Sequence, residues 1–176
     1  DTVLSTDITF DTGGGAVAAQ QLVPATDAGA ALTLAPDGGT VLLAGACGLG
    51  TQRLSALTIT DAASVQIDGA IHAAGPIAVS ARDDITLAAG VSGHTSISLS
   101  AGSDDTGGIT LGSAAMSATG TDSTVQIEAG ETSGDIVYQA GVSADTLIQL
   151  EAPGGAISLT GAGTLAADTL ALTAAT

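Results

Sequence analysis

The stretch that decides the fold runs from Ala73 to Ser92 and reads AAGPIAVSARDDITLAAGVS. It contains two short apolar triplets, Ile77-Ala78-Val79 and Ile85-Thr86-Leu87, with turn-forming residues between and around them. In both triplets the outer residues are branched aliphatics and the middle residue is small or polar, which is the alternation of a β-strand. A strand of three residues is too short to be useful alone. The pattern therefore predicts that the triplet recurs and stacks on itself.

The triplet does recur, from one end of the chain to the other. The remaining copies begin at Ile8, Leu32, Val41, Leu57, Val65, Ile97, Ile109, Val125, Ile136, Ile148, Ile157 and Leu170. Starting positions 57, 77 and 97 are evenly spaced, and positions 65 and 85 have the same spacing. Short strands at a regular period with glycine-rich turns are typical of a β-solenoid. The sequence therefore predicts an all-β solenoid with short strands and coils of about 20 residues.

Uncharged polar residues and acidic residues occupy different positions relative to the triplets. The middle residue is Thr, Ser or Gln in ten of the fourteen triplets and is never charged. The acidic residues stand between the strands instead, for example Asp61, Asp68, Asp83, Asp84, Asp104, Asp105 and Asp122. This distribution predicts an aliphatic interior, flat faces that are polar but uncharged, and acidic corners.

The composition sets the character of that interior. The chain has 176 residues and is 45% hydrophobic, yet Phe10 and Tyr138 are its only aromatic residues. Aromatic side chains normally fill much of a globular core, so this core must be narrow and aliphatic. Cys47 is the only cysteine, which excludes an internal disulfide and a cysteine-based metal site. We expect Cys47 to be a small buried filler.

The charge is strongly one-sided. Eighteen acidic residues face two basic ones, Arg53 and Arg82, for a formal charge of −16. Nucleic-acid binding requires clustered Lys and Arg, so we expect no nucleic-acid partner. We also expect no membrane insertion, because no apolar run is long enough to span a bilayer. The chain begins at Asp1 with no signal sequence, and we expect a processed form or an excised segment.

We expect residues 1–176 to form one solenoid module with two irregular parts, at 11–31 and 44–56. Within the first part, the run from Ala16 to Leu22 is compatible with one helical turn. The run from Ala114 to Thr119 is compatible with an extra strand.

The two ends of the predicted solenoid are open. Natural solenoids usually cap their terminal strands, but Thr6–Phe10 and Thr169–Thr173 both have the pattern of plain strands. Uncapped edges pair readily with further strands. We therefore predict assembly edges at Ile8, Phe10, Leu170 and Leu172. The partner is either another copy of the chain, end to end, or flanking repeats of a longer chain.

The stretch from Ala74 to Gly90 resembles the repeats of filamentous haemagglutinin-like proteins, the large adhesins of two-partner secretion in Gram-negative bacteria. Their repeats read roughly A-G-x-I-x-h-x-A-x-x-D-I-x-L-x-A-G, where h is aliphatic, and this stretch follows the pattern almost position by position. The match is clear over residues 57–111 and degenerate on either side. The resemblance implies a right-handed parallel β-helix, export, and a structural or adhesive role at a host or neighbouring cell surface. It implies an extracellular location and carries over no catalytic residues.

The main alternative is an enzyme that acts on polysaccharides, because lyases and hydrolases also use β-helices. Such chemistry needs clustered carboxylates, and the pairs Asp83-Asp84 and Asp104-Asp105 are the candidates that successive coils could bring together. Adjacent acids in turns more often solvate corners, and the scarcity of aromatic residues disfavours a sugar-stacking cleft. We therefore predict a protein that is not an enzyme, with no catalytic residues.

Other ligands are also disfavoured by the sequence. Ser103–Gly108 is only a loose version of a calcium-binding loop, so calcium remains an open alternative to a prediction of no cofactor. His72 and His94 could stack near corners of the solenoid, but no third ligand is evident, which argues against a zinc site. Alternate triplets place no regular threonine ladder on either face, which argues against ice binding.

Overall fold

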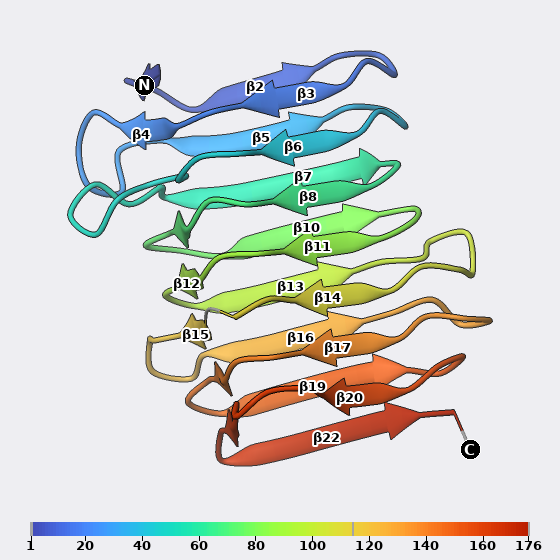
Figure 1. The fold of residues 1–176 in the computed structure, drawn as a ribbon. Coiled ribbons are helices and arrows are strands. Elements are labelled where there is room, and N and C mark those ends of the chain that lie inside the picture. The colour runs from blue at the N-terminus through green and yellow to red at the C-terminus, as the bar shows by residue number, and fades with distance from the viewer. Residues whose placement is uncertain (1, 114, 176) are drawn as a thin grey trace.

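A computed structural model describes residues 2–113 and 115–175 of the chain. The described residues form 22 β-strands and no helix. All strand pairs between successive coils are parallel, and they build three sheets, which we call A, B and C. The sheets wrap around a common interior as a β-solenoid, with the two termini at opposite ends of the stack (Figure 1). The predicted all-β solenoid is confirmed.

The chain visits the three sheets in the repeating order A, B, C. Sheet B contains β2 (Ile8–Asp11), β5 (Ala31–Ala35), β7 (Ala56–Ala62), β10 (Ile77–Ala81), β13 (Ser96–Ser100), β16 (Thr124–Glu128), β19 (Leu147–Ala152) and β22 (Thr169–Ala174). Sheet C contains β3 (Val17–Ala19), β6 (Val41–Leu43), β8 (Val65–Ile67), β11 (Ile85–Leu87), β14 (Ile109–Leu111), β17 (Ile136–Tyr138) and β20 (Ile157–Leu159).

Sheet A is built from shorter strands. They are β1 (Thr2–Leu4), β4 (Leu22–Pro24), β9 (Ile71–His72), β12 (Val91–Gly93), β15 (Met116–Ala118), β18 (Val142–Ser143) and β21 (Leu165–Ala166). Between β4 and β9 the layer is supplied by Cys47, through single parallel bridges to Leu22 and Ile71. Sheet A is therefore continuous from β1 to β21.

The coils differ in length although the strands stay in register. One column of paired residues in sheet B runs through Ile8, Leu32, Leu57, Ile77, Ile97, Val125, Ile148 and Leu170. Along this column the residue number rises in steps of 24, 25, 20, 20, 28, 23 and 22. The expected coil length therefore holds only for the two coils between Leu57 and Ile97. Elsewhere the corners take up extra residues, and the mean is roughly 23 residues.

The core is a set of aliphatic columns parallel to the solenoid axis. All fourteen predicted triplets are strands, and in the interior coils their outer residues are buried whereas the middle residues are exposed or half-buried. Ile85 shows the arrangement: it is fully buried and is paired with Val65 on one side and Ile109 on the other. Full burial of such a side chain contributes roughly 1.5–3 kcal/mol. Stacked aliphatic positions thus provide most of the core, and Tyr138 is the one aromatic residue buried among them.

Two sequence predictions need correction around residues 11–31. The run from Ala16 to Leu22 contains no helical turn, because β3 lies within it and pairs with β6. The Val17 N–H donates to the carbonyl oxygen of Thr40 at 2.8 Å, so pairing between coils overrides the helix propensity of an alanine-rich run. The irregular part at 11–31 accordingly contains two strands, β3 and β4. In the second predicted irregular part, 44–56, β7 begins at Ala56, and the residues before it form only single bridges, such as those of Cys47 and Leu54.

The predicted extra strand is present as β15, at Met116–Ala118. Ala114, at the start of the predicted run, lies outside the described residues. No other strand of sheet A was expected from the sequence.

The corners are where most acidic residues lie, and backbone geometry gives one reason. Asp37, Asp61, Asp105 and Asp122 have positive φ angles, between 49° and 76°. Aspartate tolerates this left-handed conformation better than most residues because its short polar side chain bonds locally. At the corner between sheets C and A the coils approach closely instead, and a Cβ on Gly45 would overlap the carbonyl oxygen of Gln20.

Candidate functional site

The first candidate site is the amino-terminal end of the stack. Ile8 and Phe10 occupy the positions of sheet B that are fully buried in the next coil, at Leu32 and Leu34. At the end of the stack no coil covers them, so Phe10 is 40% exposed. A hollow of about 240 Å³ opens there and is lined by Phe10, Thr12, Ala16, Val17, Ala18, Ala19, Leu22 and Leu34.

The carboxyl-terminal end has the same character. Leu170 and Leu172 of β22 continue the column positions of Ile148 and Leu150. The two β19 residues are fully buried, whereas Leu170 is 48% and Leu172 55% exposed. Leu159 of β20 is also exposed at this end. Both ends of the described stack therefore present aliphatic or aromatic side chains at positions that are interior in every coil between them.

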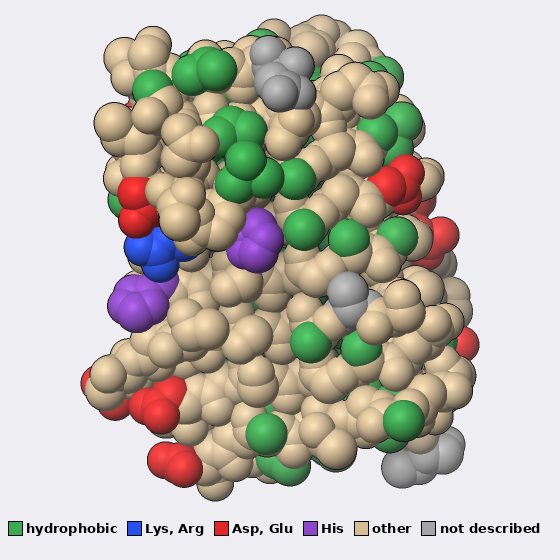
Figure 2. All heavy atoms as spheres, turned by 60° about the vertical axis from the view of Figure 1, so that its left-hand side comes forward, with side chains coloured by type: hydrophobic (Ala, Val, Ile, Leu, Met, Phe, Trp, Pro, Cys, Tyr) green, Lys and Arg blue, Asp and Glu red, His purple; other side chains and the backbone are tan. Residues whose placement is uncertain are grey.

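The side faces differ from the ends in charge and polarity. Figure 2 looks toward the side of sheet A and shows a largely uncharged surface, with acidic side chains near its margins. Ser117 and Ser143 are stacked on this face, and the Ser143 hydroxyl donates to the Ser117 hydroxyl at 3.0 Å. The predicted neutral face is seen on sheet A. On sheet B, however, acidic residues lie within the strands as well as at the corners, at Asp11, Asp61, Glu128 and Glu151.

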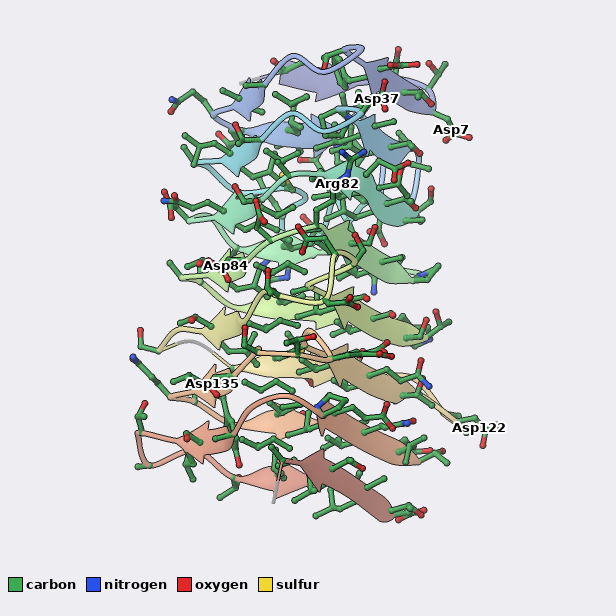
Figure 3. The ribbon with its side chains drawn as sticks, turned by 90° about the vertical axis from the view of Figure 1, so that its right-hand side faces the viewer. Asp7, Asp37, Arg82, Asp84, Asp122 and Asp135 are labelled. Atoms are coloured by element: carbon green, nitrogen blue, oxygen red, sulfur yellow. The ribbon has the colours of Figure 1, made fainter. Side chains whose placement is uncertain are left out.

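The second candidate site is a groove of about 820 Å³ along sheet C and its corner with sheet B. It is lined by Ser64, Asp83, Asp84, Thr86, Thr106, Gly107, Gly108, Thr110, Ser133, Gly134, Asp135, Val137 and Gly154. Asp84 and Asp135 stand at the same corner, two coils apart (Figure 3). Successive strands are about 4.8 Å apart, so the two backbones are separated by about 9.6 Å.

Two of the three carboxylates that line the groove, those of Asp84 and Asp135, already accept a backbone hydrogen bond. The Gly108 N–H donates to Asp84 Oδ1 at 2.8 Å, and the Ala156 N–H donates to Asp135 Oδ1 at 2.7 Å. Each aspartate directly precedes a strand, and each donor directly precedes the strand of the next coil. Asp7 is in the equivalent position, and its Oδ1 accepts a hydrogen bond from the Ala31 N–H at 2.7 Å. Each of these aspartates therefore accepts a hydrogen bond from a backbone N–H at the start of the strand in the next coil.

The predicted acidic pairs are only partly brought together. Asp83 and Asp84 line the groove, but Asp104 and Asp105 are outside its lining. Asp104 accepts a long hydrogen bond from the N–H of Thr106, at 3.4 Å, within its own turn. Asp135 was not expected from the sequence, because it comes from a different coil and is not part of an acidic pair.

Among the described residues, no group of three or more His, Cys, Asp or Glu side chains is arranged to hold a metal ion. His72 lies on β9 and His94 lies in the turn after β12. No helix in the described part of the chain has the length and hydrophobicity to cross a bilayer.

Three further polar or titratable groups belong to the solenoid itself rather than to the two candidate sites. Cys47 is buried as predicted, and burial raises the pKa of its thiol to about 12. Arg53 donates to both carboxylate oxygens of Asp27, at 3.0 and 2.8 Å, and this pairing lowers the Asp27 pKa to about 2. Ser123 is fully buried, and its hydroxyl donates to the Ala118 carbonyl at 2.9 Å and accepts the Asp145 N–H at 3.0 Å.

The fold and these sites define a β-solenoid in which the first and last described strands carry exposed apolar side chains. Comparison with protein-family models, curated proteins and solved structures found no significant match to this chain. The relation to filamentous haemagglutinin-like repeats therefore remains a resemblance of sequence pattern.

Proposed function

We propose that this chain is a structural module of an extracellular bacterial filament or large surface adhesin, extended by stacking of strand edges at its ends. The observation that carries the proposal is the exposure of Phe10, Leu170 and Leu172 at positions that are buried in the interior coils. A further coil at either end would cover these side chains and pair the open edge of the sheet. Backbone pairing and burial of side chains then drive association together.

The geometry of such stacking favours a fibre. The amino-terminal end of one copy would meet the carboxyl-terminal end of the next, which is a heterologous contact that does not close on itself. Each added coil lengthens the shaft by about 4.8 Å. The acidic corners would limit association between neighbouring shafts, because surfaces of like charge repel.

The extracellular and adhesive part of the proposal is supported by the resemblance of Ala74–Gly90 to the repeats of secreted adhesins. The presence of only two basic residues agrees with it, since trypsin-like proteases would find few cleavage sites. The location at a cell surface is thus inferred from sequence pattern and composition, whereas the role as a shaft is inferred from the fold.

Electron microscopy of the purified 176-residue chain in negative stain tests the assembly. We expect fibres of uniform width in the wild type and none in the double variant Ile8→Asp, Phe10→Asp, because two charges would be buried at each junction. Leu42→Asp is the matched control, since Leu42 is an exposed aliphatic residue on the side of sheet C.

The control should form fibres of normal length. Fibres that persist in the double variant would contradict the assigned edge. Short rods of uniform length in the wild type would instead mean that flanking repeats of a longer chain complete the ends.

An enzyme acting on polysaccharides is the second candidate, and the groove on sheet C is the observation that favours it. Asp84 and Asp135 stand at one corner of the groove, with their backbones about 9.6 Å apart, and inverting glycosidases likewise use two carboxyl groups on opposite sides of the scissile bond. Assays on acidic and neutral polysaccharides, with and without calcium, test it. Turnover that is lost in Asp84→Asn and Asp135→Asn, but kept in Asp104→Asn, would establish this candidate over the structural one.

A further inference from the structure

The groove on sheet C lies along the side of the solenoid rather than at its ends. Its lining begins at Ser64, directly before β8, and reaches Gly154 at the corner before β20. In sheet C these two strands are four strand spacings apart, or about 19 Å. The groove therefore has the length of an extended segment of a partner chain, and it is complete within one copy of the solenoid.

The charge of the groove is not compensated by the chain itself. Its acidic lining residues are Asp83, Asp84 and Asp135. The two basic residues of the chain are both described, and neither belongs to the lining. Arg53 is paired with Asp27, and the Arg82 guanidinium lies beside Gly38, at a corner nearer the amino-terminal end (Figure 3). A partner that complements the groove therefore carries positive charge.

Two of the three carboxylates are held in equivalent orientations. Asp84 and Asp135 each precede a strand of sheet C, and each accepts a backbone hydrogen bond through Oδ1 from the next coil. Because the two contacts are the same, the carboxylates are related by the same two-coil translation as their backbones, about 9.6 Å. An ionised carboxylate has further acceptor sites. Each can therefore still pair with a cationic group.

The position between these two aspartates has no side chain. The coil between them has Gly108 directly before β14, in the place that Asp84 and Asp135 occupy before β11 and β17. Gly107 precedes it with a φ of 140° and also lines the groove. Glycine allows the backbone of a ligand to approach closely. The two carboxylates therefore flank a low part of the groove wall.

The floor of the groove is uncharged. Thr86, Thr110 and Val137 are the middle residues of β11, β14 and β17, and they are paired in register as one outward-facing column. The two threonine hydroxyls can donate hydrogen bonds to carbonyl oxygens of a ligand. Val137 is half-buried and offers an apolar contact beside them.

We infer that this groove binds an extended cationic peptide in the polyproline II conformation, with basic residues at every third position. Three residues of this helix make one turn and rise about 9.3 Å, which matches the separation of about 9.6 Å between the carboxylates of Asp84 and Asp135. Basic side chains three residues apart project from the same side of such a peptide, so each pairs with one carboxylate. About six residues span the groove.

The backbone of a polyproline II segment also suits the floor. This helix has no internal hydrogen bonds, so its carbonyl oxygens are free to accept from Thr86 and Thr110. A peptide in the β conformation fits less well, because side chains on one of its sides recur about every 6.6 Å. The inference goes beyond the proposed role as a shaft and does not depend on stacking, since every lining residue belongs to one copy.

Fluorescence anisotropy with labelled peptides tests the spacing. The first peptide is Lys-Pro-Pro-Lys-Pro-Pro-Lys, and the second, Pro-Lys-Pro-Lys-Pro-Lys-Pro, has the same composition but no lysines three residues apart. We expect the wild-type chain to bind the first at least about fivefold more tightly, because only this peptide pairs with both carboxylates at once. Salt at about 1 M, where the screening length is about 3 Å, should weaken the binding.

Variants of the groove test the site. In the double variant Asp84→Asn, Asp135→Asn the amide oxygens can still accept the two backbone hydrogen bonds, and far-ultraviolet circular dichroism checks that the fold is kept. We expect this variant to bind the first peptide at least about tenfold more weakly. Asp104→Asn is the matched control, because it removes one charge outside the lining, and its affinity should stay within about twofold of the wild type.

Four results would overturn the inference. They are equal affinity for the two peptides, unchanged affinity in the double variant, equal loss in Asp104→Asn, and no binding of the first peptide at all. Spermidine and a cationic amino-sugar polymer are the competitors. If either displaces the first peptide at an equal concentration of amino groups, the groove is a general site for cations and not a peptide site. None of these results bears on fibre formation, so the inference and the end-to-end stacking can fail separately.

Discussion

The substitution Ile85→Ala probes the columns that hold the solenoid together. Ile85 is fully buried between Val65 and Ile109, and both neighbours are fixed in paired strands. Truncation removes three carbon atoms, each worth about 0.8 kcal/mol on burial, or about 2.4 kcal/mol together. The fixed neighbours cannot fill the space, so a cavity term adds to this loss. We expect the free energy of unfolding to fall by about 3–4 kcal/mol, within the range for Ile→Ala in cores.

Urea unfolding followed by far-ultraviolet circular dichroism measures this change. Thr86→Ala is the matched control, because Thr86 is the next residue in the same strand but is only half-buried and faces outward. Its cost should stay within about 0.5 kcal/mol. The more severe variant Ile85→Asp places a carboxylate in the apolar column, and we expect it to abolish local order around β11.

Two results would refute the reasoning on side-chain facing. One is an Ile85→Ala variant that unfolds within about 0.5 kcal/mol of the wild type. The other is a Thr86→Ala variant that loses as much stability as Ile85→Ala. Unchanged thermal unfolding of Ile85→Asp would lead to the same conclusion.

Three further predictions concern the polar and titratable residues Ser123, Cys47 and Asp27. Ser123→Ala leaves the buried Ala118 carbonyl and the part-buried Asp145 N–H without their partner, and urea unfolding should show a loss of about 1–3 kcal/mol. Ser117→Ala, which removes a half-buried hydroxyl from the face of sheet A, should cost less. The Cys47 thiol keeps its proton up to about pH 12 in the folded state but loses it above about pH 9.0 in the unfolded state. The free energy of unfolding should therefore fall as the pH rises between these values. This fall should be absent in Cys47→Ala. The Asp27 pKa is lowered from 3.8 to about 2, so the contribution of the ionised carboxylate to stability is present above pH 3.8 and is lost as the pH falls toward 2. The difference in unfolding midpoint between the wild type and Asp27→Asn should therefore shrink over that interval. A constant difference would contradict the assignment.

Apart from β3, the strands of sheets B and C could be predicted from the sequence because each has two large apolar residues around a middle residue. Apart from β15, the strands of sheet A could not, because most have only one aliphatic residue, followed by a small or polar one, as in Val142-Ser143. A repeated signal was available, since a glycine directly precedes Val91 and Val142. Strand pairing with neighbouring coils, rather than local propensity, decided the structure of Val17–Ala19.

The candidate sites were predictable to different degrees. The end positions at Ile8, Phe10, Leu170 and Leu172 followed from the triplet register, although their role in assembly stays a prediction. The groove was not predictable, because it depends on which corners lie above one another. Asp84 and Asp135 are distant in the sequence and meet at one corner only because the two intervening coils, although unequal in length, keep sheet C in register.

The unequal coils have a consequence for how such a chain can change over time. The short coil from Ile77 to Ile97 and the long one from Ile97 to Val125 are accommodated side by side, without any shift of the strands that follow. Insertions and deletions at a corner therefore leave the shaft intact and alter only the surface that projects from it. A lineage of such proteins could diversify its corners quickly while the columns stay unchanged.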